Sequence, residues 1–199
     1  MAGPGGHSLN RALPILGATF LWAAPAAAQN GPTRHGFWAD VEFGYGQLEM
    51  SSDQEPLTRQ SVFTLNFALG GWLNPHLRLG GELGGWLLEA FDVWDPSKGE
   101  SVSQVRAIAQ VYPWQERGFF LKAAVGQAIY TNEHPFEFDS KGWGGTIGAG
   151  YDLRVSDGFS LTPVVTFNQG TLGQVRNPVM TVRNRRYRAV DVGVAFTYR

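Results

Sequence analysis

The sequence predicts an all-β protein, an eight-stranded antiparallel up-and-down transmembrane β-barrel. Short runs in which apolar residues alternate with polar or small ones follow one another from Gly36 to the end of the chain. Alternation with period two is typical of strands that have one apolar face. The connections between the runs are alternately short and long, which is typical of barrels that span a membrane. A segment with the features of an export signal precedes them.

The first 28 residues have the organisation of a secretory signal peptide. A leader whose only full charge is Arg11 precedes an apolar stretch, and three alanines, residues 26–28, follow it. Small residues after an apolar core are typical of a cleavage site. We therefore expect residues 1–28 to be a cleaved signal peptide and residues 29–199 to form the barrel domain. The chain contains no cysteine, which excludes a lipoprotein anchor, disulfides and thiolate metal sites.

The first four alternating runs carry aromatic and aliphatic side chains on one face. They are residues 37–46, 63–70, 77–87 and 104–111. Their apolar faces include Phe43, Phe67, Leu83 and Val105, and their opposite faces Glu42, Asn66, Glu82 and Arg106. Each run therefore predicts a strand whose two faces meet different surroundings.

The last four runs repeat this pattern. They are residues 119–129, 143–153, 159–168 and 190–198. Their apolar faces include Val125, Ile147, Val165 and Val192, and their opposite faces Lys122, Thr146, Thr166 and Asp191. Within the sixth run the series Gly144, Gly148, Gly150 opens no helix, so it predicts positions facing a narrow interior and not a phosphate loop.

The connections between the runs fall into two classes. Short turns with Pro, Gly or Asp lie near Asn74, at residues 113–118 and at residues 156–158. Longer polar links lie at about residues 49–60, 89–100, 131–140 and 170–186. An even number of strands places both chain ends at the end of the short turns, which in an outer-membrane barrel is the periplasmic end.

The charges on the polar faces distinguish a soluble barrel from a membrane barrel. A soluble barrel such as a lipocalin, which the Gly-x-Trp sequence at Gly36 resembles, needs an apolar interior. The polar faces here carry many glycines, and aromatic residues gather toward the strand ends, so we expect the apolar face to meet lipid. Because buried charges must be paired, we expect the lumen charges to form an ion-pair network that plugs the barrel, with an ion path as the alternative. These charges are Asp40, Glu42, Arg78, Glu82, Arg106, Lys122, Asp152 and Asp191.

At this point the chain resembles the small eight-stranded outer-membrane barrels of the OmpA, OmpX and opacity type. The run from Val190 to Tyr198 resembles the terminal strand that the barrel-assembly machinery recognises in such proteins, although Arg199 follows the closing aromatic residue. The resemblance implies a porin-like, OmpA-like, monomeric protein of the Gram-negative cell envelope. Its partners would be outer-membrane lipids, lipopolysaccharide and the assembly machinery, and no nucleic acid, since the net charge is −1.

No catalytic, cofactor or metal site is predicted. His35, His76 and His134 have no metal-ligand spacing to one another. Lipid A deacylases that share the barrel use a His-x-Ser pair, which none of these histidines provides. We therefore expect a structural or surface-interaction role, in adhesion or lipopolysaccharide contact. A lipid A-modifying enzyme and a narrow channel for small solutes are the alternatives.

Arginines gather in the last long link and at the start of the strand that follows it. They are Arg176, Arg183, Arg185, Arg186 and Arg188, and the sequence has no acid between Gly170 and Val190. Guanidinium groups bind phosphate through two parallel hydrogen bonds, so we expect this cluster to contact lipopolysaccharide phosphates. The alternative is pairing with acids of other loops, such as Asp92 or Glu137.

Overall fold

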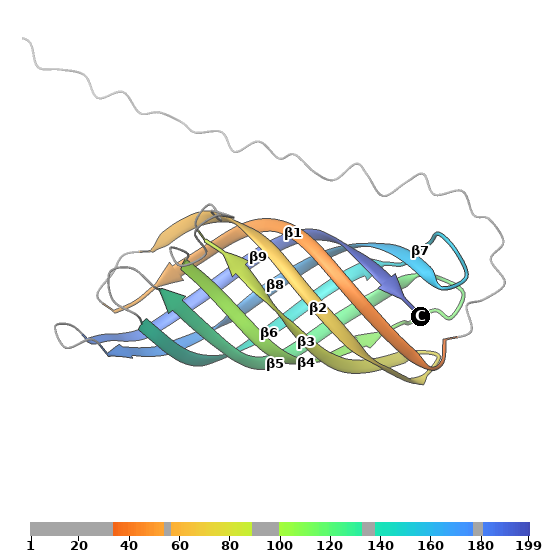
Figure 1. Cartoon of the computed structure of the whole chain (residues 1–199), viewed down its shortest axis with the longest axis horizontal. Helices are drawn as coiled ribbons and strands as arrows, with labels where there is room; N and C mark the ends of the chain where they lie inside the picture. Colours follow the sequence, from red (N-terminus) through yellow and green to blue (C-terminus); the bar gives the residue numbers. More distant parts are fainter. Residues whose placement is uncertain (1–33, 54–56, 89–99, 133–137, 177–180) are drawn as a thin grey trace, which may run out of the picture. The chain divides into compact units, whose positions relative to one another are not determined.

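The computed structural model describes residues 34–53, 57–88, 100–132, 138–176 and 181–199, and the predicted signal peptide lies outside them. The described residues form a closed antiparallel β-barrel of eight strands, which confirms the predicted fold class (Figure 1). The strands are β1 (Phe37–Ser51), β2 (Thr58–Asn74), β3 (Leu77–Leu87), β4 (Glu100–Val111), β5 (Phe119–Asn132), β6 (Phe138–Tyr151), β7 (Leu153–Arg154), β8 (Phe159–Arg176) and β9 (Thr181–Tyr198). Within these residues, no helix is long and apolar enough to cross a membrane.

Each strand from β1 to β5 pairs with the next along the chain, β7 pairs with β8 and β8 with β9, and β1 pairs with β9 to close the barrel. The short β7 continues the line of β6, and both pair with β8. The two are separated at Asp152, whose backbone N–H donates to the carbonyl of Gly118 at 2.9 Å. β6 and β7 together therefore make one barrel strand, as the sixth alternating run predicts.

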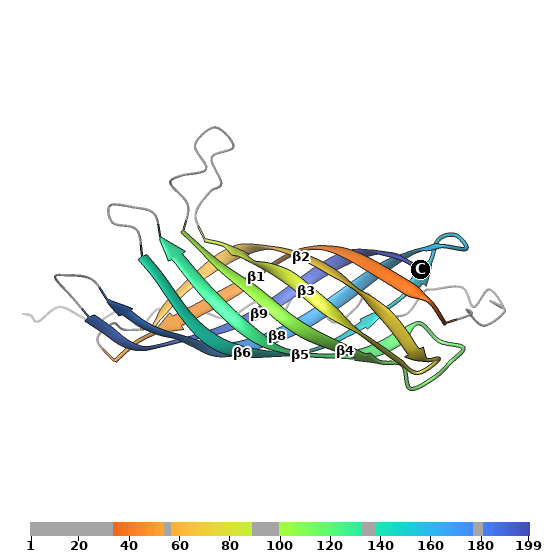
Figure 2. The same ribbon diagram turned by 60° about the horizontal axis from the view of Figure 1, so that its bottom comes forward.

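The two ends of the barrel differ in their connections. Residues 75–76, 112–118 and 155–158 connect strands at one end, which we call the short-turn end. Residues 52–57, 88–99, 133–137 and 177–180 connect strands at the other end, which we call the long-loop end (Figures 1 and 2). The chain terminus at Arg199 lies at the short-turn end (Figure 1). The predicted alternation of short and long connections is confirmed only in part, because the strands extend into the predicted long links: residues 88–99 form a long connection, whereas 52–57, 133–137 and 177–180 are each shorter than residues 112–118 at the opposite end.

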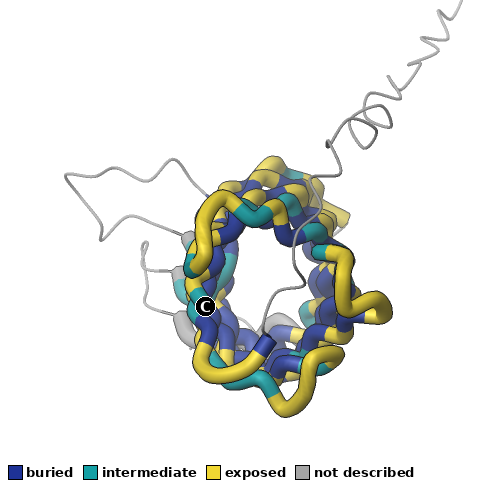
Figure 3. The backbone as a smooth tube through the Cα atoms, turned by 90° about the vertical axis from the view of Figure 1, so that its right-hand side faces the viewer, coloured by how far each residue is buried: buried dark blue, intermediate teal, exposed yellow. Residues whose placement is uncertain are grey.

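The apolar faces of the strands point outward. Buried and exposed positions alternate along the strands when the barrel is viewed from the short-turn end (Figure 3). Ile147 and Val125 are 64% and 57% exposed, whereas Arg78 is fully buried. A continuous exposed surface of this kind aggregates in water but matches the hydrocarbon of a bilayer. The protein is therefore a transmembrane barrel with charged side chains in its interior, and not a lipocalin.

The strands extend further at the long-loop end than the sequence predicts. β8 continues to Arg176 and β9 begins at Thr181, although residues 170–186 were expected to form a loop. Polar residues interrupt the alternation of apolar side chains here, but the backbone hydrogen bonds between the strands continue. The paired strands are therefore longer than the alternating runs in the sequence. Gly173, at a φ of 70°, marks a register shift in this hairpin.

The interior of the long-loop half is apolar, which the sequence analysis did not predict. The inward residues here form one buried cluster: Leu48, Met50, Val62, Trp86, Leu88, Val102, Ala128, Tyr130, Leu172, Tyr187 and Ala189. Most of them belong to strand extensions beyond the predicted runs. Gly144 faces this interior as predicted, and a Cβ there would collide with the Tyr187 hydroxyl.

Candidate functional site

The centre of the lumen holds four charged side chains from four strands. Glu42 of β1 and Glu82 of β3 face Arg106 of β4 and Lys122 of β5. Lys122 Nζ lies 2.5 Å from Glu82 Oε2 and 3.4 Å from Glu42 Oε2. Arg106 Nη2 lies 2.5 Å from Glu82 Oε1. All four are buried, so each ion pair is screened far less than a surface pair would be.

Neutral side chains complete the coordination of this central cluster. The Arg106 guanidinium donates to Thr146 Oγ1 at 2.7 Å, to Asn168 Oδ1 at 2.9 Å and to Asn66 Oδ1 at 3.3 Å. The Asn66 amide donates in turn to Glu42 at 3.2 Å. These bonds link strands on opposite sides of the lumen, because Arg106 comes from β4 and Asn168 from β8.

Asp191 lies at the boundary between the charged centre and the apolar cluster. Its carboxylate accepts hydrogen bonds from Thr64 at 2.8 Å, from the Trp86 indole at 2.9 Å and from Asn168 at 2.8 Å. Trp86 belongs to the apolar cluster and packs against Tyr187, with the two ring centres 5.5 Å apart. One side chain therefore joins the charged layer to the apolar layer above it.

The short-turn half of the lumen combines charges with aromatic rings. Arg78 Nη2 lies 3.0 Å from Asp40 Oδ2, and the guanidinium carbon of Arg78 lies 4.2 Å from the centre of the Trp38 ring. The Tyr112 hydroxyl donates to Asp152 at 2.9 Å. Burial raises the pKa of Tyr112 above its usual value, so the phenol keeps its proton and its bond to Asp152.

Two lumen cations come from outside the predicted strands. Arg199, the last residue, is paired with Asp152, and Arg34, just before β1, is 4% exposed. With them, five cations stand against the five predicted lumen acids among the described residues. The sequence analysis named only three bases, because it considered the strands alone. The five predicted lumen acids exceeded the three predicted bases by two, which indicated that two further cations were needed to pair them.

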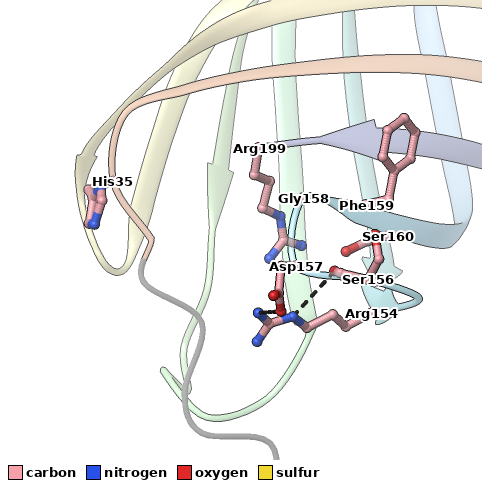
Figure 4. Close-up of a pocket in the computed structure, with 8 residues that line it drawn as sticks. All are labelled: His35, Arg154, Ser156, Asp157, Gly158, Phe159, Ser160 and Arg199. Atoms are coloured by element: carbon pink, nitrogen blue, oxygen red, sulfur yellow. Dashed lines mark hydrogen bonds and ion pairs between the residues drawn. The ribbon is translucent and has the colours of Figure 1, made fainter.

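A shallow depression of about 150 Å³ lies beside Arg199 (Figure 4). The turn between β7 and β8 lines it, and Arg154 pairs within that turn with Asp157 at 2.9 Å. His35, on its rim, is exposed. His76 Nδ1 lies 2.8 Å from the carbonyl oxygen of Tyr112, and His134 lies outside the described residues. No group of three potential metal ligands occurs in the described part of the chain.

The five predicted arginines lie on strands and not in a loop: Arg176 is the last residue of β8, and the other four belong to β9. Arg185 points inward, with its guanidinium carbon 4.3 Å from the centre of the Tyr130 ring. Arg186 and Arg188 are exposed on the outer face of β9. They line a depression of about 250 Å³ together with Glu49 and Ser51 of β1. The side chains of Arg176 and Arg183 lie outside the described part.

The fold of the chain has counterparts among solved structures. No protein-family model matches the sequence, and no curated protein is similar to it. Neisserial surface protein A is 18% identical, with a TM-score of 0.55 over 80% of this chain and 95% of that one. The chain has the fold of the small eight-stranded outer-membrane barrels. Ail, the attachment invasion locus protein of Yersinia pestis, is 11% identical, with a TM-score of 0.46 over 80% and 97% of the two chains. Outer membrane protein AlkL is 14% identical, with a TM-score of 0.49 over 88% and 94%.

Proposed function

We propose that this protein is an integral outer-membrane barrel whose lumen is plugged and whose function is performed at its surface. The observation that carries the proposal is the cross-lumen cluster of Glu42, Glu82, Arg106 and Lys122. An ion crossing the barrel would have to replace these pairs by its own contacts in a buried site, where unpaired charge is costly. An eight-stranded barrel is just wide enough for side chains to fill its interior.

The apolar cluster at the long-loop end supports the same proposal. The cluster includes Leu48, Trp86 and Tyr187, each at most 2% exposed. Most of the surface of these side chains is apolar and offers a hydrated ion no hydrogen-bonding groups. An ion entering from this end would lose water without gaining ligands. The barrel interior is therefore a structural core, and the surface that meets the surroundings is left for adhesion or lipid contact.

Lipopolysaccharide is the surface ligand that the outer rim fits best. With the short-turn end in the periplasm, Arg186 and Arg188 face the outer leaflet close to its surface. Glu49, their acidic neighbour, is already paired with Arg59. The next outward residues along β9 are Val190 and Val192, which are 52% and 61% exposed. Cations above an apolar surface match a phosphorylated headgroup above its acyl chains.

The experiment compares lipopolysaccharide binding by outward and inward arginine variants of the refolded barrel. Each basic residue near an anionic surface contributes about 1 kcal/mol, so Arg186→Gln with Arg188→Gln should weaken binding by roughly 30-fold. The residual binding should also depend less on salt. Arg185→Gln is the matched control, because it removes a charge from the same strand while leaving the outer face unchanged. Equal binding by the double variant and the control would contradict lipopolysaccharide contact at this rim.

The alternative functions make different demands on the protein. A lipid A-modifying enzyme would change the mass of lipid A in cells that produce the barrel, which mass spectrometry of extracted lipid A detects. A channel for small solutes would conduct in a planar bilayer. The proposed barrel does neither.

A further inference from the structure

Arg34 occupies a well-formed site at the short-turn end of the barrel. Its guanidinium donates to the carbonyl oxygens of Pro75 at 3.5 Å, Trp114 at 3.3 Å and Arg117 at 2.6 Å. These acceptors belong to two different turns, the one between β2 and β3 and the one between β4 and β5. A single side chain that precedes β1 therefore holds both turns.

Two aromatic rings complete the site. The guanidinium carbon of Arg34 lies 4.1 Å from the centre of the Tyr112 ring and 5.7 Å from that of Trp72. Stacking on a ring face combined with a planar fork of donors is specific to a guanidinium group. An ammonium group is a compact point charge and cannot meet three separated carbonyls and a ring face in the same way.

The walls of this site are fixed by contacts that do not involve Arg34. The rings of Tyr112 and Trp72 lie 5.0 Å apart, and Tyr112 also packs at 5.3 Å against Phe120. The Tyr112 backbone N–H donates to the carbonyl of His76 at 2.8 Å. Because these walls belong to the barrel itself, the site should persist when the Arg34 side chain is removed.

We propose that the short-turn mouth of the barrel is a guanidinium-binding site, which the chain's own N-terminal segment occupies through Arg34. The occupied site closes this mouth and ties the segment before β1 to the barrel. If cleavage follows Ala28, only five residues precede Arg34 in the mature chain.

The test removes the Arg34 side chain and offers small cations in its place. Arg34→Ala should lower the thermal unfolding midpoint by several degrees, on the order of 5 °C. Propylguanidinium should restore much of this loss, whereas propylammonium should not, and neither should shift the wild-type midpoint. Arg34→Lys should behave like Arg34→Ala, because it keeps the charge and loses the fork. An unchanged midpoint in Arg34→Ala, or equal recovery with both cations, would overturn the proposal.

A measurement on the wild-type barrel tests the same site if Arg34→Ala does not fold. Phenylglyoxal modifies accessible guanidinium groups, and the modified residues are identified by mass spectrometry. Arg34 should stay unmodified at reagent concentrations that fully modify Arg188, which is exposed on the outer face. Modification of Arg34 at the same rate as Arg188 would show that the segment is not bound and would refute the proposal.

Discussion

Removal of Arg106 is the sharpest perturbation of the lumen network. Arg106→Ala deletes the ion pair with Glu82 and the hydrogen bonds to Thr146, Asn168 and Asn66. The side chains of Arg106 and Glu82 are 5% and 2% exposed, so water cannot replace the lost partner easily. Breaking a buried pair by removing one member costs about 3–5 kcal/mol. Since Glu82 keeps Lys122 at 2.5 Å, we expect the lower part of this range.

The assay is urea unfolding of the barrel refolded in lipid vesicles. Arg59→Ala is the control, because its pair with Glu49 is exposed and such pairs contribute about 0–1 kcal/mol. Arg106→Ala should therefore lower the free energy of unfolding by at least about 2 kcal/mol more than Arg59→Ala. Combining Arg106→Ala with Glu82→Gln should cost less than the sum of the two single changes, since the neutral amide leaves no buried charge unpaired. Equal losses in Arg106→Ala and Arg59→Ala would refute the dry, paired lumen.

Three further predictions concern the lipid face, the chain end and the short-turn end. Leu83→Arg, in the middle of β3 on the outer face, should cost about 2–4 kcal/mol in the same urea assay, and Leu83→Phe should cost much less. N-terminal mass spectrometry of the envelope protein should find Gln29 first, and an intact Met1 would contradict the signal peptide. Because burial raises the pKa of Tyr112, the unfolded chain loses this proton first as pH rises, so stability should fall above about pH 10. Tyr112→Phe should reduce that alkaline fall, and an identical fall in both proteins would contradict it.

The fold could be predicted because period-two alternation survives along most of each strand. The two faces of the strands differ in residue type, as their contact with lipid or with the lumen requires. Residues on the lipid face include Phe43, Val125 and Ile147, and residues on the lumen face include Glu42, Lys122 and Thr146. The alternation of turn lengths then determined the barrel type. Strand ends were predicted less well, because residues such as Arg186 and Arg188 extend the ladder beyond the apolar surface.

The sequence predicted which charged residues face the interior, but not which of them pair with one another. The eight charged residues all point inward, but the sequence could not show that Lys122 lies between Glu42 and Glu82, since this depends on barrel register. The apolar layer around Trp86 was not predicted because most of its members lie beyond the ends of the predicted strand runs. Arg34 and Arg199 were not predicted to be lumen cations because they lie outside the strands. The excess of two acids over bases nevertheless indicated that cations were missing.

The central claim, that the lumen is closed, is tested most directly by single-channel recording in planar bilayers. With both the central ion pairs and the apolar layer in place, the wild-type barrel should show no stable conductance steps in concentrated potassium chloride. A porin reconstituted in the same way should conduct. Stable steps from the wild-type barrel whose size increases in proportion to salt concentration would contradict the account and identify the protein as a channel.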